Sequence, residues 1–570
     1  MQKNVYVKKL FTLSFALTIA LIGTIVFPPD VFADNCFITA HPTSDPAPSV
    51  FTYNGVTKVY FYCTQDKIGV SGSYPIDTIH CYSSTDMFHW KDEGTALDEK
   101  SVPWARQGFH QLWAPHVVFL KGRYCMYVPE TASDGKFYNF LATSNNPVGP
   151  FTPAPTYITG LGSGVIDPFC FIEPSDSSVW LSYRDGNNSD ISYMRMNDSG
   201  TASVGTKTIV NTGAGVGYKE GSWMWKLNSI YYLVFAFQPN NSGDEIIAYS
   251  TASSAQGPWT YHGEINARNA NEFTNHSGSC FFNNRWYFFC HNITFGGSLF
   301  GSERCSDIEY MTINGTTIPE IPKTNRGVGV PSAYGDSLQV DRGVITGATS
   351  VAIPYNAGGT EKTGWYIGSI TTNASVQYDS VDFTPTAGNK IGTVIARVSS
   401  GSATSTIEVH IGSASGTLLG TISVPRTGGL TAWTTTTAST LAATPPAGHQ
   451  NLVLVFKCAA SNTFQINWVQ FGQVPATSIK IGGVYIGQFG FEFQRIDKHT
   501  FTIDCANEAS QARIHMFNVT GREIAHAASK ISSVNNRVII DLDARHFAPG
   551  PYILSIKNHN RTAQTSFIFE

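Results

Sequence analysis

From residue 36 to about 325, short apolar segments alternate with polar turns in a pattern that repeats along the chain. Each repeat has an acidic or proline-containing turn, an apolar strand, a Gly or Asn turn, an aromatic strand and an outer strand ending near Trp or Pro. Inner strand pairs are expected at 49–66, 117–132, 169–186, 223–238 and 280–292, and outer strands at 80–94, 140–154 and 246–263. No segment of helical length with a 3.6-residue period interrupts them, so the region is predicted to be all-β.

Equivalent points of the repeat fall at Trp113, Asp167, Glu220 and His276, which are 54, 53 and 56 residues apart. The first equivalent point is Asp45, 68 residues before Trp113, which leaves room for a longer loop. A period near 50 residues with about four strands per unit predicts a β-propeller, here with five blades. The alternative is a β-sandwich in which this spacing is coincidental.

Equivalent residues of a propeller converge, because the innermost strand of every blade starts near one end of the central channel. Asp45, Asp167, Glu220 and His276 are therefore expected to face one another. A single Asp before Pro is usually a turn residue. Three acids at matching positions instead indicate a site, because crowded carboxyl groups acquire different pKa values.

Six segments of this region are distinctive: DPAPSVF from Asp45, WAPHVVF (113–119), IDPFCFI (166–172), YKEGSWMW (218–225), GPWTYHG (257–263) and TNHSGSCFFNNRWYFFCHN (274–292). Together they resemble glycoside hydrolase family 43. The resemblance covers residues 34–325 and implies a five-bladed propeller that hydrolyses xylan and arabinan side chains or ends. It also implies that Asp45 is the general base, Glu220 the general acid, and Asp167 the residue that raises the pKa of the acid and orients it.

The chemistry suits these residue types, because glycoside hydrolysis needs a protonated acid at the leaving oxygen and a carboxylate that activates water. Glu220 beside Asp167 is expected to keep its proton near neutral pH, since a nearby anion raises a carboxyl pKa. The family inverts configuration, which implies about 6.5–9.5 Å between Asp45 and Glu220, with room for a water molecule.

Four further residues of the propeller are candidate contacts. Trp104 and Trp113 are candidates for a sugar platform, with packing in the core as the alternative. Arg304 is a candidate sugar contact, although SER (302–304) stands where the family commonly has two arginines. The resemblance implies that His276 faces substrate and holds one structural Ca²⁺ together with water. A hydrogen-bonded core histidine is the alternative, and no cofactor is required for the chemistry.

The second half of the chain starts at a proline-rich segment, 319–335, which marks a domain boundary. Short strands with Thr, Ser and Gly turns then predict a β-sandwich over residues 336–472. Segments 405–429 and 451–472 resemble carbohydrate-binding module family 6, which implies that the domain stacks a sugar chain between a Tyr and a Trp beside an Asn.

The residues that match this binding site are Tyr366 and Asn467. Leu430 occupies the position of the stacking Trp, and Trp433 matches a second Trp that is more often structural. One aromatic face is therefore missing by this comparison. The alternative for Asn467 is a structural role at the end of a strand.

Residues 481–570 form a third predicted unit, a small β-sandwich. Asn518–Arg522, which ends in a TGR turn, and Gly550-Pro551-Tyr552 resemble the C-terminal sorting domains of type IX secretion. The resemblance implies that secretion machinery is a partner. An ordinary accessory domain is the alternative.

The N-terminus also indicates export. Lys8 and Lys9 precede an apolar run from Leu10 to Phe27, and Val31-Phe32-Ala33 has the small residues of a cleavage site. Residues 1–33 are therefore predicted to be a signal peptide, with a membrane anchor as the alternative. No second run of that length follows, so the mature protein is not expected to attach to a membrane through a spanning segment.

Composition narrows the classes of function. The net charge is −4 with 14% charged residues, so the chain lacks the basic excess that nucleic-acid binding needs. Hydrophobic residues make up 42%, which excludes a disordered chain. Ten cysteines occur without metal-binding spacing, and buried free thiols are expected for several of them.

The sequence therefore predicts a secreted inverting glycosidase that acts on hemicellulose (xylan, arabinoxylan or arabinan), with a sugar-binding module attached. β-Xylosidase and α-L-arabinofuranosidase activities both remain open, because the two pentoses are nearly isosteric. The alternative from another class is a non-catalytic surface lectin on a degenerate propeller. The three intact acids argue against it.

Overall fold

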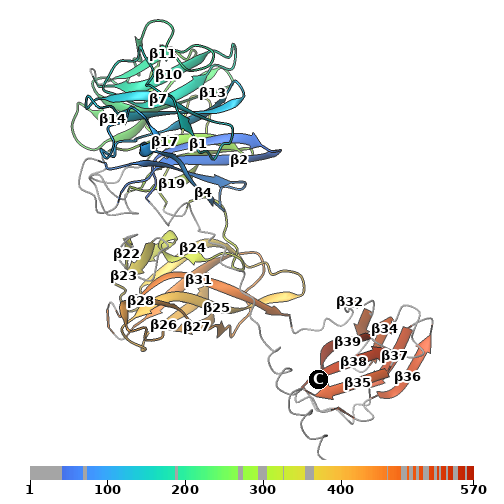
Figure 1. Ribbon diagram of the computed structural model, residues 1–570. Coiled ribbons are helices and arrows are strands. Elements are labelled where there is room, and N and C mark those ends of the chain that lie inside the picture. Colours follow the sequence, from blue (N-terminus) through green and yellow to red (C-terminus); the bar gives the residue numbers. More distant parts are fainter. Residues whose placement is uncertain are drawn as a thin grey trace, which may run out of the picture. The chain divides into compact units, whose positions relative to one another are not determined.

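The computed structural model is built from β-strands with two short 3₁₀ helices in the part of the chain that it describes (Figure 1). That part comprises residues 42–67, 74–186, 190–266, 274–292, 304–324, 327–352, 365–458, 460–461 and 463–476. Beyond residue 476 it comprises 484–486, 492–495, 500–504, 513–518, 523–524, 528–534, 537–542, 550–558 and 561–569. The chain divides into two compact units, Met1–Val474 and Pro475–Glu570.

The first half folds into five antiparallel sheets in chain order. The first sheet has β1 (Ser44–Tyr53), β2 (Val56–Thr64), β3 (Thr78–Ser84) and β4 (Lys91–Asp98), followed by the 3₁₀ helix η1 (Glu99–Ser101). The second has β5 (His116–Leu120), β6 (Arg123–Thr131), β7 (Phe137–Ser144) and β8 (Thr152–Pro153). The third has β9 (Val165–Ile172), β10 (Val179–Asp185), β11 (Ile191–Arg195) and β12 (Thr208–Ile209). The fourth has β13 (Gly217–Leu227), β14 (Ile230–Pro239), β15 (Ile246–Ala252) and β16 (Thr260–Glu264). The fifth has, within the described residues, β17 (Ser277–Phe282), β18 (Arg285–His291) and β19 (Ser306–Met311).

The five sheets are the blades of a closed propeller. The first strand of each sheet contacts the first strand of the next, in the order β1, β5, β9, β13 and β17, and β17 contacts β1 again. The apolar and aromatic positions of neighbouring blades pack between the sheets. They form one large core cluster and two smaller ones, the first in blades one and five and the second in blades two and three. The predicted all-β fold with a five-bladed propeller is confirmed.

The ring closes where the residue before β1 meets the fifth blade. The backbone N–H of Thr43 donates to the carbonyl of Arg304 at 2.9 Å. The N–H of Ser306 donates to the Thr43 hydroxyl at 3.1 Å. We call this junction of Thr43 with residues 304–306 the seam, and Asp45 lies two residues beyond it.

The second domain is a β-sandwich of two facing sheets, and its strand bounds are as follows. One sheet has β22 (Thr349–Ala352), β23 (Trp365–Gly368), β31 (Phe464–Pro475), β25 (Asn389–Ser400) and β28 (Gly429–Thr435) in this order, with β20 (Leu338–Gln339) on β31 and β29 (Ser439–Thr440) on β25. The 3₁₀ helix η2 (Val340–Arg342) leads to the other sheet, β21 (Val344–Thr346), β24 (Ser375–Asp382), β30 (His449–Lys457), β26 (Thr406–Ile411) and β27 (Thr417–Ser423). Apolar positions of both sheets alternate with polar ones and bury a separate core, as the sequence predicts.

The C-terminal unit also has two sheets. The larger has β32 (Val484–Ile486), β33 (Glu492–Arg495), β34 (Thr500–Asp504), β37 (Arg537–Leu542) and β36 (Ala528–Val534) in this order. The smaller has β35 (Arg513–Asn518), β38 (Gly550–Asn558) and β39 (Arg561–Phe569). Gly550-Pro551-Tyr552 opens β38, whereas the TGR turn lies outside the described residues.

Eight cysteines lie in the described part of the chain, and all are buried free thiols, as expected for several of them. The predicted signal peptide, residues 1–33, lies outside the described residues. Within the described residues, no helix has the length and hydropathy needed to cross a bilayer.

Candidate active site

A cavity of about 370 Å³ opens where the inner strands of the propeller begin. This volume lies within the range of small-molecule sites. The cavity is lined by Asp45, Tyr74, Trp113, Ile166, Asp167, Tyr218, Glu220, Gln238, Glu245, Thr274, His276 and Arg304. The structure thus brings together the three acids and the histidine that the repeat places at equivalent points.

Local backbone geometry presents these side chains to the cavity. Asp45 and Asp167 have positive φ values of 54° and 53°, unusual for non-glycine residues, and each precedes a proline. Glycine follows Glu220, and Gly221 has a φ of 56°. A Cβ at Gly221 would lie 3.0 Å from the His276 ring, so glycine permits the close approach of the ring. An aspartate with positive φ followed by proline therefore occurs at the same position in blades one and three.

Asp45 is held as a carboxylate. It is 6% exposed, pairs with Arg304 Nη1 at 3.3 Å, and accepts a 2.6 Å hydrogen bond from the Thr64 hydroxyl. Burial alone would raise the pKa of Asp45, but Arg304 and then His276 lower it to about 2. His291 Nε2 accepts the Asp45 backbone N–H at 2.8 Å, which supports a structural role for this histidine.

Glu220 has the opposite environment. Burial and the neighbouring Asp167 carboxylate raise the pKa of Glu220 to about 7. The Tyr218 hydroxyl donates a short hydrogen bond to Glu220 Oε2. Two carboxyl groups of one cavity are thus kept in different protonation states near neutral pH.

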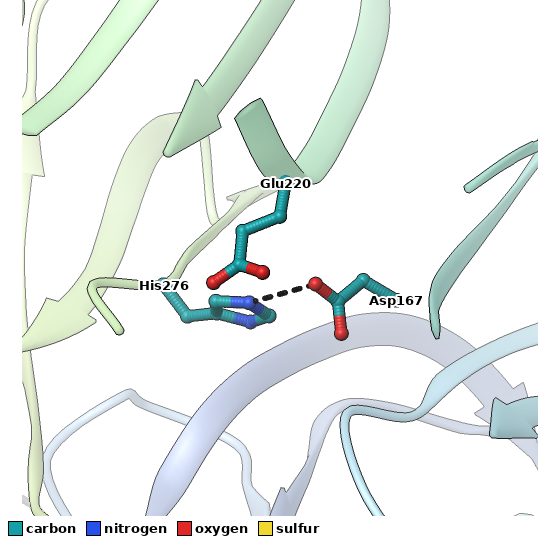
Figure 2. A group of neighbouring side chains, drawn as sticks. All are labelled: Asp167, Glu220 and His276. Carbon is teal, nitrogen blue, oxygen red and sulfur yellow. Dashed lines mark ion pairs between the residues drawn. The ribbon is translucent and has the colours of Figure 1, made fainter. Parts of the chain in front are cut away.

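His276 lies between the acids (Figure 2). The carboxyl groups of Glu220 and Asp167 both point toward its ring, and Asp167 Oδ2 lies 3.3 Å from Nε2. Asp45 Oδ1 lies 3.6 Å from Nδ1. Burial opposes a charge on His276, but Asp167 and Asp45 raise its pKa to about 10. The ring is therefore an imidazolium that offsets part of the negative charge.

Asp167, Glu220 and His276 also form a group that could hold a metal ion. They offer one ligand atom each, and these atoms lie within 4.8 Å of one another. A hollow of about 20 Å³, large enough for one water molecule, is lined by Asp45, Asp167, His276 and the buried His116. Two carboxylates and an imidazole are suitable donors for a divalent cation, provided that the ring loses its proton.

Of the three other residues of the propeller that were predicted to contact sugar, two line the cavity and one does not. Trp113 lines the cavity, and its Nε1 donates to the Tyr74 carbonyl at 3.1 Å. Arg304 also lines it, pairing with Asp66 at 2.9 Å as well as with Asp45. Trp104 lies outside the lining and packs edge-on against Phe140 and Tyr157, with centroid distances of 5.2 and 5.4 Å. This position corresponds to the packing alternative.

In the second domain, the Tyr366 and Trp433 rings pack edge to face with centroids 5.2 Å apart. Both residues are half-buried, and Leu430 has a similar exposure. Asn467 has no exposed surface. The two rings therefore form a cluster in which one predicted contact residue, Tyr366, keeps partial access to solvent.

Five further residues line the cavity but were not predicted from the repeat: Tyr218, Glu245, Gln238, Tyr74 and Thr274. Tyr218 lies two residues before Glu220 and could have been proposed from that spacing, because alternate residues of a strand share a face. Glu245 precedes the third strand of its blade, so it falls outside the repeat position that identified the acids.

The fold and the cavity define a β-propeller with a buried cluster of acids and a histidine, followed by two accessory β-sandwiches. Residues 41–317 match the Glycosyl hydrolases family 43, and residues 347–473 match the Carbohydrate binding module (family 6). Residues 497–570 match the Secretion system C-terminal sorting domain. The chain therefore carries a family 43 glycoside hydrolase domain, a family 6 module and a sorting domain that marks it for export to the cell surface or beyond.

Two curated proteins illustrate the similarity. Xylosidase/arabinosidase 43A of Humicola insolens is 28% identical over 306 residues, which cover 45% of this chain and 89% of that protein. Arabinoxylan arabinofuranohydrolase of Bacillus subtilis (strain 168) is 26% identical over 511 residues, which cover 77% of this chain and 92% of that protein.

Among solved structures, one similar chain is a glycoside hydrolase family 43 arabinoxylan arabinofuranohydrolase from Bacillus subtilis in complex with cellotetraose. It is 22% identical, with a TM-score of 0.46, and the match covers 77% of this chain and 97% of that chain.

Proposed function

We propose that the protein is an inverting glycosidase that removes single pentose units from arabinoxylan or xylan. Asp45 acts as general base, Glu220 as general acid, and Asp167 as the residue that raises the pKa of Glu220. The α-L-arabinofuranosyl unit is the first candidate, because the Bacillus subtilis arabinoxylan arabinofuranohydrolase matches this chain across both the propeller and the following module. The β-xylosyl unit is the second, because another relative is a xylosidase/arabinosidase.

The observation that carries this proposal is the pair of opposite pKa shifts in one cavity. The pKa of Asp45 is lowered to about 2, and that of Glu220 is raised to about 7. Groups whose environments separate their pKa values in this way are suited to base and acid roles. Asp45 accepts a proton from the attacking water, and Glu220 donates its proton to the departing glycosidic oxygen.

Surrounding residues hold these groups in place. Arg304 and His276 are cations that keep Asp45 ionised, and the Tyr218 hydroxyl fixes Glu220. Asp167 Oδ2 accepts the Gly221 N–H at 3.3 Å, which ties the orientation of this carboxylate to the residue after the acid. Trp113 forms an apolar wall for the sugar.

Substrate screening with the stereochemistry of the product tests this proposal. Aryl α-L-arabinofuranoside and aryl β-xyloside should be hydrolysed, and proton NMR of early turnover should show the inverted anomer. Asp45→Asn should lose about 10²–10⁴-fold in kcat while remaining folded. A retained anomer would refute the mechanism. A folded wild-type protein that binds sugar but hydrolyses no glycoside would favour the lectin alternative.

The bounds and functions of the individual segments of the chain are also part of the proposal. We propose that residues 1–33 are removed as a signal peptide, that the propeller spans 34–325, and that 336–472 retains the enzyme on polysaccharide through Tyr366. Asn467, which is fully buried, takes the structural role instead. Residues 481–570 engage secretion machinery. Retention on insoluble arabinoxylan should fall in Tyr366→Ala, while hydrolysis of a small aryl glycoside stays unchanged.

A cation in the propeller is a further part of the proposal. His276, with Asp167 nearby, would hold one structural Ca²⁺ whose remaining ligands are water molecules, consistent with the preference of Ca²⁺ for oxygen. The ion would supply positive charge among the carboxylates. Added Ca²⁺ should raise the Tm of protein treated with chelator. An unchanged Tm would contradict the Ca²⁺ site and would indicate that the His276 imidazolium supplies the positive charge among the carboxylates.

A further inference from the structure

Glu245 is a fourth acid of the cavity, and the mechanism above does not use it. It directly precedes β15, the third strand of the fourth blade. Its side chain lines the same cavity as Glu220 and Asp167, and the residue is only 4% exposed. Burying a further carboxyl group among other carboxyl groups costs free energy unless the group is neutral and hydrogen-bonded.

The Glu245 carboxyl is held from one side. Its Oε2 accepts the backbone N–H of Asn275 at 2.9 Å, and the Asn275 side-chain amide donates to the Glu245 carbonyl at 3.3 Å. Asn275 precedes His276, so the loop that presents His276 also fixes Glu245. The other oxygen, Oε1, is buried and has no hydrogen-bond partner within the described part of the chain.

The charges around Glu245 favour its neutral form. Burial, followed by the Glu220 carboxyl, raises the pKa of Glu245 well above its usual value, and Asp167 acts in the same direction. Asn275 N–H and His276 act against this shift. Because Oε2 accepts the Asn275 N–H, the proton is best placed on Oε1. The cavity therefore contains a fixed carboxylic acid with an unused hydrogen-bonding oxygen.

We propose that Glu245 is a substrate-binding residue, whose Oε1 forms a hydrogen bond with one hydroxyl of the sugar unit in the cavity. This inference rests on the proposed function and names a specificity determinant of that same site. A neutral polyhydroxyl ligand satisfies Oε1 without adding charge. A uronic acid would bring a further carboxylate among Asp45, Asp167 and Glu220, so the site should reject it.

The kinetic test compares Glu245→Gln with Glu245→Leu on an aryl α-L-arabinofuranoside and an aryl β-xyloside. Glutamine keeps a hydrogen-bonding side chain of the same shape, so kcat/KM should stay within about threefold of wild type. Leucine cannot form the bond, and kcat/KM should fall about 10–100-fold, mainly through KM. An equal loss in both variants, or no loss in leucine, would overturn the proposal.

Monodeoxy substrates locate the partner hydroxyl. For one of these substrates, kcat/KM of the wild-type enzyme should fall by about the same factor as kcat/KM of Glu245→Leu falls on the complete sugar. The same deoxygenation should cost the leucine variant little more, because the two changes remove one interaction. Additive losses for every hydroxyl would show that Glu245 does not bind the sugar directly.

Glu130 provides a matched control. It is fully buried in β6 outside the cavity lining, its Oε1 accepts the Thr131 N–H, and its Oε2 is likewise buried and unpaired within the described residues. Burial raises its pKa to about 8. Glu130→Gln and Glu130→Leu should report the stability effect of altering such a group, without altering KM or the response to deoxygenation.

A pH profile separates binding from an indirect effect on the acid. If Glu245 acts only through Glu220, Glu245→Gln would move the alkaline limb of kcat/KM and leave KM unchanged, which would refute direct binding. If wild type hydrolyses no glycoside, the proposed function fails first. Titration of intrinsic tryptophan fluorescence with free arabinose and xylose then decides, because Trp113 lines the cavity. Weaker binding in Glu245→Leu but not Glu130→Leu supports the inference, and equal or absent binding overturns it.

Discussion

Replacing Asp167 by asparagine removes one negative charge beside Glu220 and changes the side-chain shape very little. Burial and then Asp167 raise the pKa of Glu220 from 4.5 to about 7, so Glu220 of the variant should titrate between these values. In the proposed mechanism Glu220 acts as an acid, so activity is present below its pKa and is lost as the pH rises through it. The alkaline limb of kcat/KM should therefore move to lower pH.

The size of the effect follows from the protonated fraction. At pH 7, about half of wild-type Glu220 carries its proton. If the pKa falls to ~6 in Asp167→Asn, about a tenth does, so kcat/KM at pH 7 drops about fivefold for this reason alone. The asparagine carbonyl can still accept the Gly221 N–H, but the ion pair with His276 is lost. Some of the loss should therefore persist at every pH.

The assay is kcat/KM between pH 4 and 9, measured with two aryl glycosides. A substrate with a poor leaving group needs the proton of Glu220 and should show the shifted limb. A substrate with an acidic phenol as leaving group needs it less and should show a smaller effect. Glu130→Gln serves as a control for altering a buried acid elsewhere. An alkaline limb at the wild-type position in Asp167→Asn would refute the assignment of Asp167.

Three other results are expected. Arg304→Met should move the acidic limb of kcat/KM upward, because Arg304 is the largest influence that lowers the pKa of Asp45 against its burial; an unmoved limb would contradict this role. Glu220→Ala should hydrolyse substrates with acidic leaving groups far better than natural ones, and mass spectrometry should detect no covalent glycosyl-enzyme during turnover if the reaction inverts. Deletion of 336–570 should leave kcat/KM on small aryl glycosides unchanged, while a pull-down should show weaker binding to insoluble arabinoxylan. A folded but inactive truncated protein would instead place part of the site in the accessory domains.

The site was predictable from the sequence wherever it follows the repeat. Asp45, Asp167, Glu220 and His276 stand at one repeat position in blades one, three, four and five, and a closed ring brings such positions together. Glu245 does not stand at that position. Its contribution depends on how the loop before β15 packs against Asn275, and the strand pattern contains no signal for this contact.

Trp104 illustrates the opposite difficulty. An aromatic residue in a long loop near the site suggests a sugar platform, but its position depends on neighbours that are distant in sequence. Phe140 of the second blade and Tyr157, which lies between β8 and β9, contact the ring edge-on, and burial against them is favourable for a large apolar side chain. Composition identifies the residue type, whereas only packing decides which face of the blade it covers.

The seam of the propeller has a consequence for how the enzyme loses activity. Arg304 contributes its carbonyl to Thr43 and its guanidinium to Asp45 and Asp66, so one residue joins the two ends of the ring and one reacting group. Separation of blades one and five would therefore release Asp45 from its counter-charge while the sheets themselves remain paired. Heat or denaturant should thus abolish turnover before circular dichroism reports loss of strand structure, because the proposed base, Asp45, loses its ion pair with Arg304 when the ring opens.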